Sequence, residues 1–247
     1  MVFWKNKSFL GSILFLGLMA VLWWQAQWAE TVLVINDPKS NIAIYEGFST
    51  SAQLNEQELL SLIKTIEKPL TIVDLRQETH GFVNGVAISW YSPRNWANRG
   101  KSQSLVVTEE KQKLQKLRDS FFGILYGKKW IPIPFKVRNA YTEEELVAAT
   151  AADYQRITVT DHLCPSEEQT QTLTKLFIAA NSQKPCRWLH FHCYAGRGRS
   201  KTAASMYRIF RGESIKDILR EDWGEDLSEE KIAFLEEYRR QLTGTTL

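Results

Sequence analysis

The chain has 247 residues, of which 44% are hydrophobic and 24% are charged. This composition is ordinary for a folded globular protein, and it excludes an intrinsically disordered, collagen-like or disulfide-rich chain. The formal net charge is only +3, so no basic field covers the whole protein. Nucleic acid is therefore not an expected partner, and any site for an anion must be local.

Residues 1–29 are predicted to lie outside the folded domain, which we place at residues 30–247. Two early lysines precede an apolar run from Phe9 to Trp24, which is the pattern of a secretory signal. The run is shorter than the roughly 20 residues that cross a bilayer comfortably. Two interpretations stay open, a cleaved signal peptide and a retained membrane anchor. Both predict an exported protein, which is periplasmic, secreted or attached to the inner membrane through residues 1–29.

Strands and helices alternate along the predicted domain. Asn55 with Glu58 has the spacing of a helix-capping box, and two acidic residues after Thr108 suit the first turn of a helix. In chain order, the pattern predicts strands at 31–35 and 41–45, a helix at 55–66, strands at 70–75 and 86–90, a helix at 108–126, a strand at 130–134, a helix at 142–152, a strand at 155–159, a helix at 166–181, a strand at 186–192, and helices at 199–211, 214–221 and 228–242. Helices between strands indicate a single α/β domain.

The segment from Trp188 to Ser200 carries the strongest chemical signal. Its sequence, WLHFHCYAGRGRS, describes an apolar strand, a glycine-containing loop and the start of a helix. Such a loop gathers backbone N–H groups around an anion, and the helix N-terminus adds partial positive charge. Cys193 opens the loop and Arg199 closes it, so a thiolate and a guanidinium would face one phosphoryl group. Ser200 would donate its hydroxyl to the sulfur, and His192 would hold the loop through its ring hydrogen bonds.

Two other phosphate-binding loops fit this segment poorly. In a Walker loop, Ala195 and Ser200 would stand where glycines are required, and the dinucleotide fingerprint lacks its third glycine. A buried structural cysteine at a turn between strand and helix is the simplest alternative, but it leaves Arg199 and the two loop glycines unexplained. The pattern therefore predicts Cys193 as a nucleophile and Arg199 as a phosphate-binding residue.

At this loop the sequence resembles the cysteine-dependent phosphatases of the protein-tyrosine-phosphatase superfamily. IVDLRQETHGFVNG at residues 72–85, SWY at 89–91 and DHLCP at 161–165 narrow the resemblance to bacterial protein-tyrosine-phosphatase-like inositol polyphosphatases, the cysteine phytases. The resemblance covers about residues 70–210. It departs from the family where Lys201 interrupts the usual run of threonines and where the tail is shorter than usual. The resemblance implies a phosphatase domain with a central twisted sheet flanked by helices, no cofactor, and a small polyanionic phosphate ester as substrate.

The resemblance also supplies a general acid, Asp161. An alkoxide is a poor leaving group, so a positioned carboxylic acid must protonate it as the P–O bond breaks. Without the resemblance, Asp161 would be an ordinary turn residue. A second arginine at the loop rim, Arg197, favours a substrate with several phosphates. The substrate-binding residues that we expect are Tyr194, Ala195, Gly196, Arg197, Gly198, His162 and Arg76.

Three functions share these features. An inositol polyphosphate such as phytate is the preferred substrate, while a phosphotyrosine or phosphoinositide phosphatase would use the same chemistry. A catalytically silent phosphate-binding module is the alternative from another class. Asp74, Glu78 and His80 are expected to form a structural hydrogen-bond network under the loop.

The cysteine and histidine spacings contain no recognisable metal motif. Neither Cys-x-x-Cys nor His-Glu-x-x-His occurs, and His190 and His192 are expected on opposite faces of their strand, so no metal site is predicted. Cys164 lies three residues after Asp161. Loop closure would bring it near Cys193, which raises the hypothesis of a reversible disulfide that protects the nucleophile.

Overall fold

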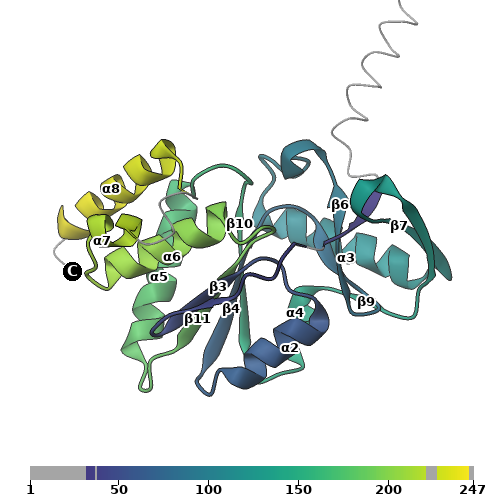
Figure 1. The fold of residues 1–247 in the computed structure, drawn as a ribbon, viewed down its shortest axis with the longest axis horizontal. Coiled ribbons are helices and arrows are strands. Elements are labelled where there is room, and N and C mark those ends of the chain that lie inside the picture. The colour runs from purple at the N-terminus through teal and green to yellow at the C-terminus, as the bar shows by residue number, and fades with distance from the viewer. Residues whose placement is uncertain (1–31, 37, 221–226, 245–247) are drawn as a thin grey trace, which may run out of the picture.

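The computed structural model describes residues 32–36, 38–220 and 227–244 (Figure 1). The predicted signal or anchor, residues 1–29, lies outside these described ranges. Within them, no helix is both long enough and apolar enough to cross a membrane. Two twisted sheets flanked by helices form a mixed α/β fold.

A five-stranded sheet forms the centre of the fold (Figure 1). Its order is β10 (Asp153–Val159), β4 (Leu70–Arg76), β11 (Trp188–His192), β3 (Phe48–Ser51) and β2 (Ala43–Ile44). All neighbours are parallel except β2 and β3. Every residue of β11 and β4 is buried, as expected of parallel strands covered on both faces.

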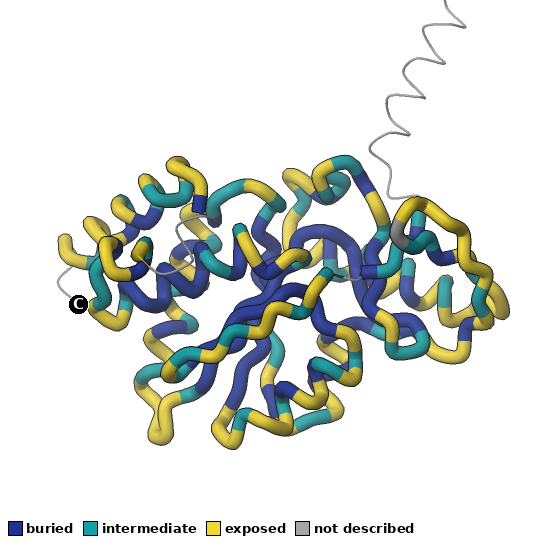
Figure 2. The backbone as a smooth tube through the Cα atoms, viewed as in Figure 1, coloured by how far each residue is buried: buried dark blue, intermediate teal, exposed yellow. Residues whose placement is uncertain are grey.

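Helices cover both faces of this sheet. One face packs against α5 (Glu167–Ser182), α6 (Gly198–Phe210), α7 (Ile215–Arg220) and α8 (Glu229–Gly244), through an apolar cluster that includes Phe177, Phe191 and Tyr207. The other face packs against α2 (Glu56–Thr65) and α4 (Glu143–Ala148) through Leu59 and Ile72. Figure 2 shows the resulting buried band through the middle of the molecule. The central loop after β11 is thereby held on a rigid base.

A second sheet of six strands lies beside the first (Figure 1). Its order is β8 (Pro132–Lys136), β7 (Phe122–Tyr126), β1 (Val32–Ile35), β6 (Val86–Tyr91), β5 (His80–Val83) and β9 (Ala140–Tyr141). Only β1 and β7 pair in parallel. The helix α3 (Gln103–Arg118) packs on this sheet through Leu114, which joins Leu33, Ile88 and Leu125 in a separate apolar cluster. The prediction of one central sheet is therefore incomplete.

The predicted helix at 108–126 is wrong at both ends. Helix α3 begins after Ser102, whose side chain accepts a hydrogen bond from the N–H of Leu105, and it ends before Asp119. Residues Phe122–Tyr126 form a strand instead. The acidic residues near 109 belong to the second turn of α3, so they do not mark its start.

Strands β3 and β5 were not predicted at all. The sequence of β3, FSTS, is mostly hydroxyl side chains, and β5 reads HGFV. Both are fully buried between neighbours, so tertiary hydrogen bonding replaces the alternation of apolar and polar residues that marks a typical strand. The capped helices α2 and α5 confirm their predictions to within about two residues.

Candidate active site

The candidate site lies where parallel strands end together. Strands β3, β4, β10 and β11 run in the same direction, so their carboxyl ends share one edge of the sheet. Cys193 follows β11 directly and Asp161 follows β10 by two residues. Clefts at this edge are the usual ligand sites of such sheets. The topology thus joins two predicted catalytic residues that lie far apart in the sequence.

The backbone of the loop turns its carbonyl groups outward. The carbonyl of Tyr194 accepts a hydrogen bond from the N–H of Gln53, 3.1 Å away. The carbonyl of Ala195 accepts one from the side-chain amide of Asn41 at 3.4 Å. In a planar trans peptide the N–H points opposite to the C=O. The N–H groups of residues 195 and 196 therefore point to the other side, which is the geometry of an anion cradle.

Gly196 is the residue that permits this turn. Its φ is +71°, a left-handed backbone conformation that residues other than glycine rarely adopt. A Cβ atom at this position would lie 2.5 Å from the backbone nitrogen of Ala52 and 2.6 Å from Oδ1 of Asn41. The loop packs so closely against the end of β3 that no side chain fits at position 196 without movement of the backbone.

Cys193 and Ser200 face each other across the loop. The Cys193 side chain is buried, with 3% exposed, and its Sγ lies 3.5 Å from the hydroxyl oxygen of Ser200. Ser200 is in the first turn of α6 and is also buried. This contact is the one expected if the hydroxyl donates to a thiolate.

Arg199 is held by a buried carboxylate. Its Nη1 and Nη2 donate to the two oxygens of Glu78 at 2.5 and 2.8 Å, and Nη1 also reaches the carbonyl of Val159 at 3.3 Å. Burial alone would lower the pKa of Arg199, but Glu78, with smaller contributions from Cys193 and Asp161, raises it. Within the described part of the chain, the buried Nε of Arg199 has no hydrogen-bond partner. One donor of a fully ionised guanidinium is therefore left for an anion.

Glu78 bridges two arginines. Burial would raise the pKa of Glu78, but Arg199 and Arg76 hold it well below its ordinary range. Arg76 is fully buried and donates to Glu78 Oε1 at 2.9 Å, Gln53 Oε1 at 2.8 Å and the hydroxyl of Ser89 at 2.5 Å. Each of its three nitrogens thus has a protein partner. We correct the predicted substrate contact of Arg76 to a positioning role for Glu78.

Asp161 lies beside Arg199. Its Oδ1 is 3.2 Å from Nη2 of Arg199, and its Oδ2 accepts a hydrogen bond of 2.7 Å from the side chain of Asn95. The indole N–H of Trp96 donates to the backbone carbonyl of Asp161 at 2.9 Å. Asn95 and its neighbour Arg94 have left-handed φ values of +59° and +56°. A strained turn of the 93–95 segment therefore fixes the predicted general acid over the loop.

Beneath the loop is a buried network of acidic and basic side chains. The ring of His192 lies 3.0 Å from Glu143, and that of His80 lies 3.1 Å from Asp74. Burial would raise the pKa of Asp74, but Arg156 and His80 hold it well below its ordinary range. This is the structural network that we expected. His192 thus ties the end of β11 to α4, and it makes no ring contact with the loop backbone in the described structure.

The predicted orientation of His190 and His192 is wrong. Their rings stack with centroids 6.1 Å apart and an angle of 14° between planes. Residues two apart in a strand point to the same face, so the expectation of opposite faces misapplied the period of the strand. Possible ligand atoms of Asp74, Glu143 and His192 lie within 4.8 Å of one another. Because these groups already pair with His80, Arg156 and each other, we assign them to the network.

The remaining predicted contacts line the rim. Ala195 and Arg197 are exposed, Tyr194 and Gly198 are partly buried, and the side chain of His162 is 67% exposed. Sequence reasoning missed Lys231 of α8. A Cβ atom at Gly198 would lie 3.1 Å from the Nζ of Lys231, so this ammonium reaches the loop backbone. Cys164 is a free thiol that contacts the start of α8 near Glu230.

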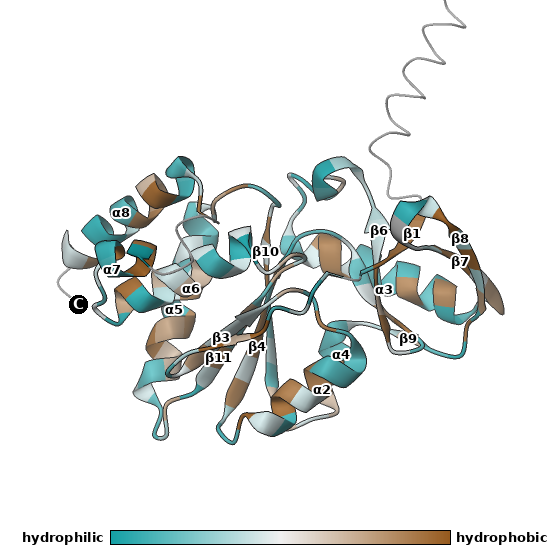
Figure 3. Cartoon of the chain, in the orientation of Figure 1, coloured by the Kyte–Doolittle hydropathy of each residue, from teal (hydrophilic) through white to brown (hydrophobic). Residues whose placement is uncertain are grey.

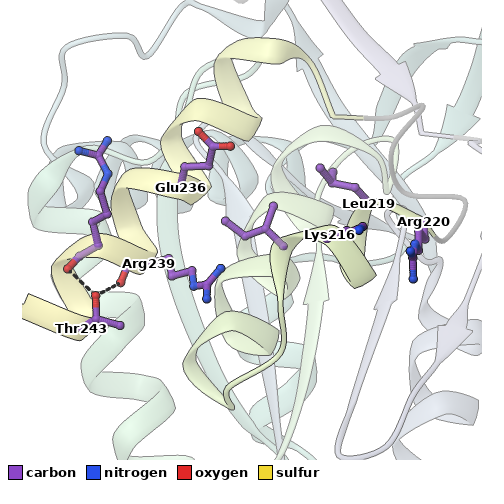
Figure 4. Close-up of a pocket in the computed structure, with 8 residues that line it drawn as sticks. Lys216, Leu219, Arg220, Glu236, Arg239 and Thr243 are labelled. Carbon is purple, nitrogen blue, oxygen red and sulfur yellow. Dashed lines mark hydrogen bonds between the residues drawn. The ribbon is translucent and has the colours of Figure 1, made fainter.

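A separate hollow of about 700 Å³ lies between α7 and α8 (Figure 4). Its walls include Lys216, Leu219 and Arg239, and no predicted site residue lines it. The predicted catalytic residues therefore lie at the edge of the five-stranded sheet, outside this hollow.

A thiol, an arginine and a carboxylic acid around one strand–loop–helix unit are the groups that the resemblance to cysteine-dependent phosphatases predicts. Residues 126–211 match the model of the protein-tyrosine-phosphatase-like phytase family, whose description reads inositol hexakisphosphate. Solved structures agree with this match. The chain is 29% identical to the tandemly repeated protein tyrosine phosphatase-like phytase from Mitsuokella multacida, with a TM-score of 0.69, and the match covers 81% of this chain and 38% of that one. It is 25% identical to a phytase of the same type from Bdellovibrio bacteriovorus, with a TM-score of 0.69 and coverage of 86% and 89%.

A curated relative extends the comparison. The effector protein hopD2 of Pseudomonas syringae pv. tomato is 38% identical over 156 residues, which cover 58% of this chain and 32% of that protein. The chain thus spans about a third of the length of this relative and 38% of the Mitsuokella chain. The family and structural matches confirm the resemblance to protein-tyrosine-phosphatase-like phytases.

Proposed function

We propose that the protein hydrolyses phosphate monoesters of inositol polyphosphates, such as phytate, through a phosphocysteine intermediate. The observation that carries this proposal is the meeting of Cys193, Arg199 and Asp161 at one edge of the sheet, with the Arg199 Nε unpaired. A thiol and an acid placed together around an anion cradle suit phosphoryl transfer, whereas a pure phosphate-binding module needs neither group.

The first step transfers the phosphoryl group to sulfur. The thiolate of Cys193 attacks phosphorus, so a P–S bond forms while the P–O bond to the inositol breaks. The loop N–H groups and Arg199 hold the nonbridging oxygens, on which negative charge is concentrated. Asp161 gives its proton to the leaving alkoxide.

The second step releases inorganic phosphate. Asp161, now a carboxylate, takes a proton from a water molecule that attacks phosphorus, and the P–S bond breaks. The hydroxyl of Ser200, 3.5 Å from the sulfur, donates to the departing thiolate. Glu78 keeps the guanidinium of Arg199 in place throughout, through two hydrogen bonds that leave the Nε free.

A substrate with several phosphates is supported by the cations around the loop. Arg197 is exposed at the rim, and Lys231 approaches from α8. The structure of the Mitsuokella relative was solved with myo-inositol-(1,3,4,5)-tetrakisphosphate; that relative is 29% identical, with a TM-score of 0.69 over 80% of this chain and 38% of that one. A phosphate next to the reacting one would lie within reach of such cations, which a lone phosphotyrosine does not need.

Initial rates on three substrates test the proposal. The panel contains phytate, a phosphotyrosine peptide and a soluble phosphoinositide, and each is assayed with the parent, Cys193→Ser and Cys186→Ser. Cys186 is exposed and precedes β11, at the opposite end of that strand from Cys193, so its variant controls for loss of a thiol. We expect phytate to have the highest kcat/KM and Cys193→Ser alone to be inactive. A higher kcat/KM on the peptide or the phosphoinositide would replace the proposed substrate, and equal rates for Cys193→Ser and the parent would refute thiol catalysis.

We also propose that residues 1–29 direct export of the chain. The support is the basic start and the apolar run of the sequence. The mass of the protein recovered from an expressing bacterium distinguishes the two alternatives. Loss of about 29 residues would identify a cleaved signal, and the full mass in the membrane fraction would identify an anchor. Full-length protein confined to the cytosol would refute export.

A further inference from the structure

The six-stranded sheet carries an apolar surface that the proposed phosphatase function does not use. We call it the β7–β8 face and define it by Tyr91, Phe121, Phe122, Ile124 and Trp130. These are five of the thirteen large hydrophobic side chains that are exposed among the described residues, and Phe122 is 67% exposed. In Figure 3, strands β7 and β8 are strongly hydrophobic at the end of the molecule remote from α8. A contiguous apolar surface of this kind marks a contact with a partner or a membrane.

The alternation of side chains along β7 shows that the exposed apolar residues of this strand point away from the core. Leu125 of β7 is buried in the cluster under α3, whereas its neighbour Ile124 is 54% exposed on the opposite side. A sheet with one covered face normally presents polar side chains on the other. Here the outward positions of β7 hold Phe122 and Ile124 instead. Packing of the described domain therefore does not account for them.

The position of this face relates it to the N-terminal segment. Strand β1 begins at Val32 and pairs with β7 through Val34 and Tyr126. The apolar run ends at Trp24, so only residues 25–31 join it to β1. An extended chain of that length reaches roughly 25 Å at most. When the run is inserted in a bilayer, the start of β1 and the adjoining β7–β8 hairpin must stay close to the lipid headgroups.

The side chains suit that environment. Trp130 packs edge-on against Tyr91 with ring centroids 4.8 Å apart, and aromatic residues of this kind favour the headgroup region. Exposed Lys129 and Lys136 flank the apolar residues, and the Nζ of Lys136 lies 4.7 Å from the ring centre of Phe121. Lysines beside apolar side chains bind surfaces that contain anionic lipids.

The edge of the sheet disfavours pairing with another copy of the chain. Strand β8 is the edge strand, and it contains Pro132 and Pro134. Proline lacks the N–H that an added strand would need, so it protects an edge from association. A bilayer needs no backbone pairing.

We propose that the β7–β8 face lies on the surface of an anionic lipid bilayer, beside the point where residues 1–29 enter it. The contact would hold the domain in a fixed orientation on the membrane, with the face toward the lipid. This proposal rests on the retention of residues 1–29 as an anchor, the second of the two alternatives above. It does not depend on the chemistry at Cys193, so its failure would leave the proposed phosphatase function untouched.

Vesicle sedimentation tests the proposal with the full chain. A protease site is inserted after Ala29, and the protein is reconstituted into vesicles of phosphatidylcholine with phosphatidylglycerol. Cleavage then severs the folded domain from the segment in the bilayer. The parent is compared with Phe122→Ser/Ile124→Ser and with Ile178→Ser. Ile178 is a matched control because it is 43% exposed on α5, on the other side of the molecule.

The domain of the parent and of Ile178→Ser should stay with the vesicles after cleavage. The double variant should lose roughly a hundredfold in partitioning, because each of the two large apolar side chains contributes about a factor of ten when buried. Circular dichroism and thermal unfolding verify that both variants remain folded, since all three residues are exposed. Release of the parent as complete as that of the double variant would overturn the proposal. So would a dimer of the released parent domain that the double variant does not form, since a second copy would then cover the face.

Discussion

Replacement of Gly196 by alanine tests whether the cradle depends on a backbone that only glycine allows. Gly212 provides a matched control, because it lies just beyond the other end of α6 with a φ of +92°. A Cβ atom at Gly212 would meet nothing within 4 Å, whereas at Gly196 it would lie 2.5 Å from Ala52 N and 2.6 Å from Asn41 Oδ1. The two variants thus share the left-handed conformation and differ in the steric clash.

The expected magnitudes follow from these two costs. An alanine in the left-handed region costs about 1–2 kcal/mol, and this is the whole effect at Gly212. At Gly196, the clash of the added Cβ with backbone atoms lowers the stability by about 1–3 kcal/mol more, because backbone atoms cannot rotate away as a side chain can. Relief of that clash must move the peptide groups of residues 195 and 196, which supply the inward N–H donors. Loss of one such donor in a preorganised site costs about 10²–10³ in kcat.

Urea unfolding and initial rates on phytate measure both effects. Gly212→Ala should lose about 1–2 kcal/mol of stability and keep the kcat of the parent. Gly196→Ala should lose more stability, about 100-fold or more in kcat, and a similar factor in inhibition by inorganic phosphate. If Gly196→Ala retains the kcat and phosphate inhibition of the parent, the outward carbonyls of the loop do not define the cradle, and the reasoning fails.

Four further predictions concern the groups around the loop. The free energy of unfolding of Glu78→Gln, measured in urea, should be about 3–5 kcal/mol lower, because two buried arginines lose their charge partner. Glu144→Gln is the control: it breaks an exposed pair with Lys111 and should change the free energy of unfolding by less than about 1 kcal/mol. Asn95→Ala should lower kcat on phytate roughly tenfold but spare p-nitrophenyl phosphate, whose leaving group needs no proton; equal losses on both substrates would contradict a role through Asp161. Lys231→Met should raise the KM for phytate roughly tenfold with kcat unchanged, and an unaltered KM would remove Lys231 from the substrate site. Burial and Arg76 would lower the pKa of His80, but the nearby carboxylates of Asp74 and Glu110 raise it from 6.5 to about 9. The charged ring therefore stabilises the fold fully below about pH 6.5, and this stability is lost as the pH rises through 9. The free energy of unfolding should fall by up to about 3 kcal/mol between these pH values. His80→Gln should remove this fall, and His162→Gln should keep it.

Local signals in the sequence located most of the helices. The capping boxes of α2 and α5 involve residues three apart, so a short window contains all the atoms that determine where the helix begins. The boundary between α3 and β7 depends on tertiary contacts instead. Phe122–Tyr126 is a strand because β1 and β8 pair with it on either side, and neither neighbour is visible from the segment itself.

The site residues that are close together in the sequence could likewise be predicted, whereas the residues that hold them in place could not. Cys193, Arg199 and Ser200 belong to one loop and one helix turn, so their spacing alone brings them together. Glu78, between β4 and β5, binds Arg199, Asn95 binds Asp161, and Lys231 of α8 approaches Gly198. Only the fold brings these residues to the site. Asp161 was found through the resemblance, because an aspartate after a strand has no distinctive spacing of its own.

Arg76 shows why the charge of a residue does not by itself assign its role. A guanidinium in a phosphatase sequence suggests a ligand for phosphate, but Arg76 is fully buried and its nitrogens are used by Glu78, Gln53 and Ser89. Arg199 is equally buried, yet two of its nitrogens bind Glu78 and its Nε is left unpaired. Glu78 offers one negative charge to two arginines, and the N-terminus of α6 adds partial positive charge at the loop. That charge, fixed in place before substrate arrives, is what a dianionic phosphoryl group requires.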